Sequence, residues 1–349
     1  MKSTTTIGLD LAKSVFQIHG VDAEGKVVLR RKLRRADLLE FLGKLPPCLI
    51  GMEACGTSHY WARELEKLGH RVKQMPAEYV KGYGRRGKKT DAADAEAICE
   101  AVTRPRLRQV PTKSVEQQTA TMPHTVRNQL VATRTANANM IRSLMAEFGI
   151  TAATGESGFA WLMSIVVDAA RLELSARQRA ALAPMAGVLA EIDAAIAAVD
   201  AQIASHAKSC PIATRLASAP GIGAIISSAF SATVTDATMF KSGRAFSAWL
   251  GQTPKISGTG GEVTLGAITK AGNEYLRRLL FLGAASRLAF AKRCPAKADP
   301  QLLAMLDKWD FKKAASALAN KMARVIWALM VRGGSYEDNH RPAAFAANA

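Results

Sequence analysis

The N-terminal third of the chain alternates between short apolar runs and amphipathic stretches, in an order that few folds share. Five runs have the composition and alternation of strands: residues 4–11, 14–21, 26–33, 48–52 and 71–75. Three stretches have the spacing of helices: residues 36–45, 58–68 and 90–103. A tight turn at residues 22–25 joins the second and third strands. We therefore expect an antiparallel meander followed by alternating helices and strands.

This order is that of a ribonuclease H-like α/β domain, and it decides where four acidic residues lie. Asp10 is on the first strand, and Glu53 is at the carboxyl end of the fourth, where open α/β sheets bind ligands. Asp91 and Asp94 are three residues apart on a helix that Thr90 is expected to cap, so both face one side. Four carboxylates together can hold two divalent cations, and such hard oxygen ligands imply Mg²⁺ or Mn²⁺.

Each of these acids also has a structural interpretation. Asp91 and Asp94 would interact favourably with the dipole of a helix that begins beside them, and Asp10 alone could cap a turn. Asp10 lies between Leu9 and Leu11, however, and a buried carboxylate without a partner is costly. As a set, the four acids favour a metal site.

The chain as a whole is strongly basic. It has 349 residues, of which 47 are Lys or Arg and 29 are Asp or Glu, and its formal net charge is +18. A surface of this charge favours polyanions, because phosphates release counterions when they are neutralised. There is no uninterrupted apolar run of about 18 residues and no signal-peptide pattern, which argues against a membrane protein. We expect a cytoplasmic protein that binds nucleic acid and has no membrane partner.

A basic, glycine-rich segment directly precedes the helix with the paired aspartates. One interpretation is a solvated loop, which is the usual structure of a run of charges. Its position beside the acids favours instead a loop that grips phosphates of the substrate. The cations of this segment are Lys81, Arg85, Arg86, Lys88 and Lys89.

The middle of the chain is predicted to be helical. Residues 118–148 and 176–207 are two long helical stretches, in which Pro123 marks a kink or a helix start and Pro184 a break. Apolar residues recur at three- and four-residue steps in the second stretch. That stripe suits an antiparallel hairpin or an oligomerising coiled coil, and packing in a core explains it equally well.

The predicted architecture is thus α/β plus all-α. The expected parts are a catalytic α/β domain (1–107), a helical or coiled-coil linker (108–209), a mostly helical domain (210–332) and a disordered tail (333–349). The last long helix is expected over residues 311–331 and packs into the core of its domain.

Two glycine-bearing motifs in the C-terminal part indicate contacts with phosphates. Pro220-Gly221-Ile222-Gly223 before a helix is typical of helix-hairpin-helix modules, although the same turn also serves as an ordinary helix cap. Further on, Ser257 and Thr259 alternate with glycines in a segment that can approach a nucleic-acid backbone closely. A β-hairpin with a glycine-rich tip explains that segment equally well. The predicted nucleic-acid contacts here are Gly221, Gly223, Lys255, Lys270, Arg277 and Arg278.

The chain resembles the insertion-sequence-110 family of transposases from about residue 4 to about residue 332. These DEDD recombinases have a RuvC-like N-terminal domain and a serine-bearing C-terminal domain. The matching segments are Gly8-Leu9-Asp10-Leu11-Ala12-Lys13, Met52-Glu53-Ala54-Cys55-Gly56, Lys89-Thr90-Asp91-Ala92-Ala93-Asp94-Ala95, Pro220-Gly221-Ile222-Gly223 and residues 250–278. Each segment is short, but their order and spacing together are specific.

The resemblance implies a site-specific DNA recombinase that moves its own element. In this family the four acids act with a serine of the distal domain, which attacks the DNA phosphate and forms a covalent phosphoserine. Family members use a structured RNA to specify both DNAs and work as tetramers built from dimers. The implied partners are therefore the element ends, the target DNA, a guide RNA and further copies of the chain.

One departure from the family pattern concerns the nucleophile. The family serine stands directly before paired glycines, and here that place is taken by Thr259, while Ser257 stands two positions earlier. Either Ser257 is the nucleophile, which we favour, or Thr259 replaces it with a secondary hydroxyl. A decayed, inactive copy is a third interpretation.

Two other classes of function stay open at this point. A junction-resolving or RNA-cutting nuclease would use the same acids with water as the nucleophile and would leave no protein–DNA adduct. A protein that only binds DNA would need no metal and would tolerate the loss of Asp10. A simple nuclease has no use for Ser257 or Thr259, so that segment argues against the first alternative.

Overall fold

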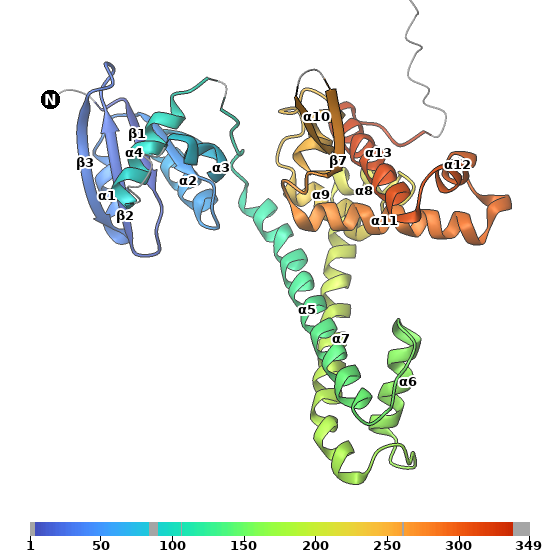
Figure 1. Cartoon of the computed structure of the whole chain (residues 1–349). Coiled ribbons are helices and arrows are strands. Elements are labelled where there is room, and N and C mark those ends of the chain that lie inside the picture. Colours follow the sequence, from blue (N-terminus) through green and yellow to red (C-terminus); the bar gives the residue numbers. More distant parts are fainter. Residues whose placement is uncertain (1–3, 84–89, 106, 260–261, 338–349) are drawn as a thin grey trace, which may run out of the picture. The chain divides into compact units, whose positions relative to one another are not determined.

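The computed structural model describes residues 4–83, 90–105, 107–259 and 262–337. The chain divides into two compact units, Met1–Val115 and Glu116–Ala349 (Figure 1). Each unit has its own hydrophobic core.

The first unit is built on a mixed five-stranded sheet. Its strands are β1 (Thr6–Asp10), β2 (Val15–Val21), β3 (Val27–Arg34), β4 (Leu49–Glu53) and β5 (Arg71–Met75). They lie in the order β3-β2-β1-β4-β5; β1, β2 and β3 pair antiparallel, and β1, β4 and β5 pair parallel. The predicted succession of strands is confirmed, and it is the arrangement expected of a ribonuclease H-like sheet.

Helices cover both faces of this sheet. The helices of the first unit are η1 (Arg35–Asp37), α1 (Leu38–Gly43), α2 (Ser58–Lys67), α3 (Ala77–Val80), η2 (Lys81–Tyr83) and α4 (Asp91–Val102). Leu38 of α1 and Leu65 of α2 join one core with Ile7 and Leu9 of β1, because alternate residues of a strand face the same side. The helix α3, which follows Pro76, was not predicted.

The helix α4 packs on the other face, over β1, β2 and β4. A glycine permits this close approach: a side chain at Gly8 would collide with the backbone of Ala95 and Cys99. The predicted N-cap is confirmed, because the Thr90 hydroxyl accepts a hydrogen bond from the amide of Ala93 at 3.2 Å. The cap fixes the start of α4, and the close approach at Gly8 lets the helix pack against β1.

The second unit begins with a long helical hairpin, α5 (Val115–Ala146) and α7 (Ala176–Ser209), with α6 (Glu156–Val167) beside it. Ion pairs join Arg127 to Asp200 and Arg134 to Asp193. As the residue number rises along α5 it falls along α7, so the two helices run antiparallel. Pro123 and Pro184 both lie inside continuous helices, so the expected break at Pro184 is wrong.

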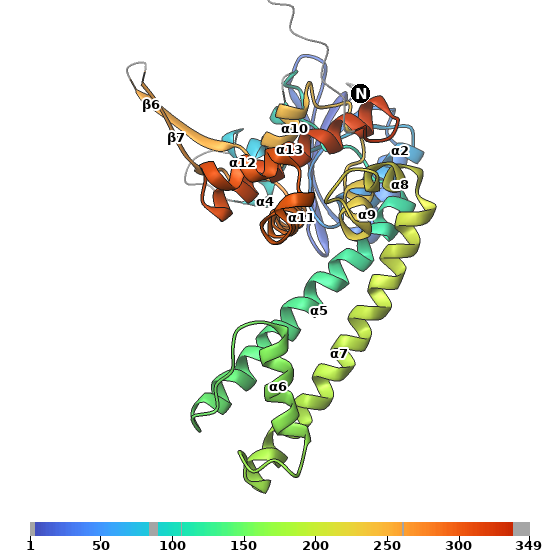
Figure 2. The same ribbon diagram turned by 90° about the vertical axis from the view of Figure 1, so that its right-hand side faces the viewer.

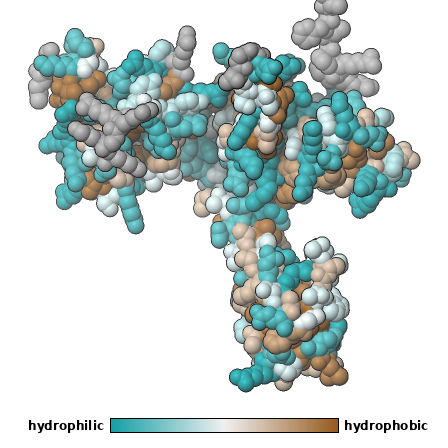
Figure 3. All heavy atoms as spheres, viewed as in Figure 1, coloured by the Kyte–Doolittle hydropathy of each residue, from teal (hydrophilic) through white to brown (hydrophobic). Residues whose placement is uncertain are grey.

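Among the residues that the structure describes, one helix, α7, is long and apolar enough by length and composition to cross a membrane. Glu191 and Asp193 interrupt its apolar stretch, so this helix does not contradict the expectation that the chain has no uninterrupted apolar run of about 18 residues. Two of its aspartates, Asp193 and Asp200, pair with arginines of α5, which favours packing against protein. The end of the hairpin nevertheless shows apolar surface (Figure 3), to which the exposed Val167 and Leu172 contribute.

The remainder of the second unit is a helical body with one β-hairpin (Figures 1 and 2). Its elements are α8 (Pro211–Ala217), α9 (Ala224–Thr233), α10 (Gly243–Trp249), β6 (Pro254–Thr259), β7 (Glu262–Ile268), α11 (Glu274–Arg293), η3 (Pro295–Lys297), α12 (Pro300–Lys308) and α13 (Phe311–Arg332). The predicted last helix is confirmed: Leu318, Met322 and Ile326 of α13 are buried in the core that α9, α10 and α11 complete.

Candidate active site and nucleic-acid contacts

Four acidic side chains gather at the carboxyl edge of the sheet in the first unit. Asp10 ends β1 and Glu53 ends β4, and these are neighbouring parallel strands. Asp91 and Asp94 lie in the first turn of α4, which packs on β1. Two strand ends and one helix start therefore bring the four acids to one region.

The four carboxylates influence one another electrostatically. Burial, and after it the negative charges of Asp94, Asp91 and Glu53 in that order of strength, together raise the pKa of Asp10 to about 6. A hydrogen bond from the backbone of Leu11 opposes this shift. A carboxyl whose pKa is raised in part by neighbouring negative charges is one whose ionised form a bound cation would stabilise.

The donor set suits a hard divalent cation, because it consists of carboxylate oxygens. Within the described ranges, however, no three His, Cys, Asp or Glu side chains form a ready-made cluster that could hold an ion. The carboxylates are thus near enough to Asp10 to affect its pKa, but they do not surround one common position for an ion. A cation would have to draw their side chains together.

The predicted phosphate-gripping segment is only partly described. Lys81 lies exposed in η2, which follows α3. The other cations of this segment, Arg85, Arg86, Lys88 and Lys89, lie outside the described residues.

The candidate nucleophiles lie on the hairpin β6–β7 of the second unit, which projects from the helical body (Figure 2). Ser257 is opposite Thr264, and Thr259, the last residue of β6, is opposite Glu262. Both strands are exposed along nearly their whole length. The predicted glycine-rich segment is therefore a β-hairpin, and the Ser257 hydroxyl is open to solvent.

The hairpin has two chemically different faces. Ile256 is paired with Leu265, and Val263 lies two residues away on the same face. These side chains are 73%, 65% and 66% exposed, respectively. Ser257 and Thr264 lie on the opposite face, so the hydroxyls and the apolar side chains are separated.

The base of the hairpin is held by backbone contacts. Gly251 has a φ of 72°, and a side chain there would collide with the backbone of Ala271. The Arg277 guanidinium donates to the carbonyl oxygens of Leu250 at 3.2 Å and Ala271 at 2.7 Å. Arg277, predicted to contact nucleic acid, therefore also has a structural role at this base.

The other predicted cations of this region differ in how far they are engaged. Lys255 and Lys270 are exposed, and Lys270 has a φ of 57°. Arg278 donates a hydrogen bond to Asn128 of α5 and lies over the ring of Tyr275 at 5.6 Å. Arg278 thus links α11 of the helical body to the long helix α5 within the second unit.

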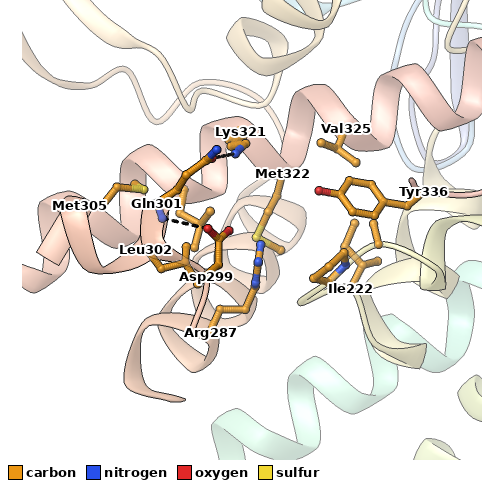
Figure 4. A pocket seen from close by; sticks show the side chains of 13 residues that line it. Ile222, Arg287, Asp299, Gln301, Leu302, Met305, Lys321, Met322, Val325 and Tyr336 are labelled. Carbon is orange, nitrogen blue, oxygen red and sulfur yellow. Dashed lines mark hydrogen bonds between the residues drawn. The ribbon is translucent and has the colours of Figure 1, made fainter. Parts of the chain in front are cut away.

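The turn Pro220–Gly223 joins α8 and α9, and its Gly221 has a φ of 82°, which favours glycine. A small pocket lies beside it, where Ile222 faces Arg287, Met322 and Tyr336 (Figure 4). A side chain at Gly221 would meet Arg287, so the turn needs this glycine for packing. Gly223 is the N-cap residue of α9 and has open space where a side chain would be.

A buried polar network was missed by the sequence analysis. The Ser228 hydroxyl lies 2.8 Å from His124 Nε2 and 2.8 Å from His206 Nδ1, and His124 Nδ1 lies 3.1 Å from the Tyr275 hydroxyl. Burial lowers the pKa of His124 to about 4. The network joins α5, α7, α9 and α11, and no local pattern in the sequence reveals it.

Comparison with known proteins gives matches over nearly the whole chain. The family described as Transposase IS116/IS110/IS902 matches residues 213–298, and the DEDD transposase of IS110 matches residues 7–150. A Pseudomonas aeruginosa protein named as a family 20 transposase is 45% identical, over 95% of this chain and 98% of its own. The transposase for insertion sequence element IS1111A of Coxiella burnetii is 34% identical, over 96% of this chain and 92% of its own.

Proposed function

The chain belongs to the IS116/IS110/IS902 family of transposases, and from that premise we propose that its four acids and a hydroxyl of the β6–β7 hairpin cut and rejoin DNA strands. A transposase of this kind acts on DNA, and its DEDD domain points to dependence on a divalent metal. The observation that carries the proposal is that two neighbouring strand ends and the first turn of α4 bring Asp10, Glu53, Asp91 and Asp94 to one region of the first unit.

In this proposal the acids hold Mg²⁺ or Mn²⁺. The bound ions would neutralise charge on the phosphate and make an oxygen more reactive by lowering its pKa. Asp10 and Glu53 offer ligands from strand ends, which the sheet fixes, whereas Asp91 and Asp94 offer ligands from the first turn of α4. The carboxylate of Asp10 must be ionised to serve, and a neighbouring cation lowers its pKa.

The hydroxyl of Ser257 is the nucleophile that we favour. Its Oγ loses a proton and forms a bond to the phosphorus, and the bond from phosphorus to one DNA oxygen breaks. That oxygen takes up a proton and leaves as a free strand end. Attack by a hydroxyl of another DNA strand then releases Ser257, so that the energy of the first bond is kept for rejoining.

Thr259 stays as the alternative nucleophile. It stands directly before Gly260 and Gly261, which lie outside the described residues, and its backbone pairs with Glu262. A primary hydroxyl attacks phosphorus with less steric hindrance than a secondary one, which favours Ser257. Ser257 is also exposed, so the DNA can reach it.

The partners follow from the same proposal. Element ends and target DNA are the substrates, a structured RNA guides their choice, and two or four copies of the chain hold the strands. Phosphates are bound by the basic segment 81–89, by the turn at Gly221 and Gly223, and by Lys255, Lys270, Arg277 and Arg278. We also propose that the chain has domain boundaries at about residues 107, 209 and 332. We propose that the protein acts in the cytoplasm.

A covalent adduct tests the proposal directly. Purified protein, Mg²⁺, element-end DNA and RNA transcribed beside the gene are mixed and run on a denaturing gel, with EDTA in place of Mg²⁺ as the control. A metal-dependent band of protein linked to DNA supports the hydroxyl mechanism. Metal-dependent nicking without this band would assign the site to a nuclease that uses water, and DNA binding without nicking would leave only a binding protein.

A further inference from the structure

The edge strand β3 carries four cations among its last five residues, and a fifth follows directly. They are Arg30, Arg31, Lys32, Arg34 and Arg35. Successive side chains of a strand point to opposite faces, so this run is divided between the two sides of the sheet. The two sides use their cations differently.

On the side of α1 and α2, the arginines stack on aromatic rings of the core. The Arg31 guanidinium lies 4.9 Å from the ring centroid of Phe41, and that of Arg35 lies 4.8 Å from the ring of Trp61. Such cation–π contacts stabilise the packing of the unit. These two residues therefore have a structural explanation.

On the opposite side, the cations share a sheet face with the catalytic acids. Asp10 is paired with Gln17, and Gln17 with Lys32, so that Asp10 and Lys32 belong to one row across the sheet. With neighbouring strands about 4.8 Å apart, Lys32 lies roughly 10 Å from Asp10. Arg30 belongs to the next row, which runs through His19 to Gly8.

Among the residues that the structure describes, this face of β3 is open. The helix α4 covers β1, β2 and β4, whereas β3 is the outer edge of the sheet (Figure 1). Arg30 and Lys32 are exposed, and no hydrogen bond or ion pair joins either of them to another described residue. Arg34 lies on the same face, but it is paired with Asp37 at 2.8 Å.

We propose that Arg30 and Lys32 form a phosphate-binding track on β3 for the DNA strand that enters the acid site. The inference rests on the proposed function in taking DNA as the substrate. The two side chains are two residues apart, about 7 Å along the strand. They offer two positive charges beside an acidic site that must accept a polyanion. Such contacts position the backbone and do not read bases.

The test measures DNA binding by the full chain without divalent metal, so that cleavage plays no part. A labelled element-end duplex and a scrambled duplex are titrated over a series of salt concentrations. The track variant is Arg30→Gln/Lys32→Gln. The matched control, Arg71→Gln/Lys44→Gln, removes one exposed Arg and one exposed Lys of the same unit that lie outside β3. A charge-keeping variant, Arg30→Lys/Lys32→Arg, and melting temperatures check that lost binding is not lost folding.

The track variant is expected to weaken binding to both duplexes equally and to reduce the slope of log K against log salt by about 2. The control and the charge-keeping variant are expected to retain the slope of the wild type. A track variant with the slope of the control overturns the inference, and so does a loss confined to the element-end duplex, because phosphate contacts do not read bases. The two proposals can fail separately. If the wild type forms no adduct in Mg²⁺ but the track variant still loses DNA binding, the proposed function is overturned and the phosphate-binding track is not.

Discussion

The acid site of the first unit and the hydroxyl hairpin of the second are built in opposite ways. Asp10 and Glu53 end strands that are paired on both sides, and burial together with neighbouring negative charges raises the pKa of Asp10 to about 6. Ser257 lies on a two-stranded ribbon that is exposed on both faces. A ribbon of two strands is marginally stable by itself, so this one depends on the helices at its base. One half of the proposed site is held by a sheet, and the other half is presented to solvent.

This difference assigns different tasks to the two halves. Crowded carboxylates need a fixed frame, because their repulsion would separate them if the frame could relax. A nucleophile that must reach a phosphate, attack it and later leave it needs access more than rigidity. Changes in the acid site are therefore expected to abolish chemistry, whereas changes in the hairpin are expected to stop the covalent step alone.

The largest effect is expected from Asp10→Asn. The substitution keeps the shape of the side chain but removes the charge that would hold a cation, so DNA cleavage in Mg²⁺ should fall by more than about a hundredfold. DNA binding should be nearly unchanged, as measured by titration in EDTA. The control is Asp37→Asn, which removes a half-buried aspartate of the same unit that pairs with Arg34. Cleavage at wild-type rates by Asp10→Asn would disprove the metal site.

The next effect separates the two candidate hydroxyls. Ser257→Ala should remove the protein–DNA adduct, whereas Thr259→Ala should retain it, because only one of the two oxygens attacks phosphorus. Thr264→Ala, which removes a hydroxyl opposite Ser257, is the matched control. The measurement is the amount of adduct on a denaturing gel. Adduct that survives Ser257→Ala and disappears in Thr259→Ala would make Thr259 the nucleophile.

A third substitution tests how rigid the frame of the acids is. Gly8→Ala would force α4 away from β1, because the new methyl group would collide with the backbone of Ala95 and Cys99. We expect the first unit to lose about 3 kcal/mol of unfolding free energy in a denaturant titration. Gly56→Ala, at a site with open space, should change the unfolding free energy much less. Equal stability of the two variants would mean that α4 is not tightly held.

Much of the first unit could be predicted because its pattern is local. Apolar alternation located all five strands, and the parallel pairing of β1 and β4 then places Asp10 and Glu53 at one edge of the sheet. The Thr90 cap could be predicted from the residue type alone. The helix α3 escaped because it has only four residues, too few for a periodic pattern.

The second unit was less predictable because its decisive contacts join distant residues. His124 meets Ser228 and Tyr275, which are 104 and 151 positions away. No residue near His124 indicates these partners. Pro184 was read as a break because proline removes one backbone donor, yet α7 continues through it. The separation of apolar and hydroxyl side chains on the β6–β7 hairpin could not be predicted either. It depends on the pairing of Ile256 with Leu265, and the sequence does not give the register of the two strands.

The smallest effect is expected on the pH dependence of stability, through His124 in the buried network with Ser228, His206 and Tyr275. His124 has a pKa of about 4 in the folded chain, below the ordinary 6.5, because its site is buried. Between these values the unfolded chain binds the extra proton, so stability is complete above about pH 6.5 and falls as the pH decreases toward 4. The loss of unfolding free energy is about 3 kcal/mol at most.

His124→Gln should be less stable at pH 7 but should show a flatter decline of the unfolding free energy in denaturant titrations from pH 7 to 4. An equally steep decline in that variant would place the acid sensitivity elsewhere, and His59, whose pKa burial also lowers to about 4, would be the next histidine to replace.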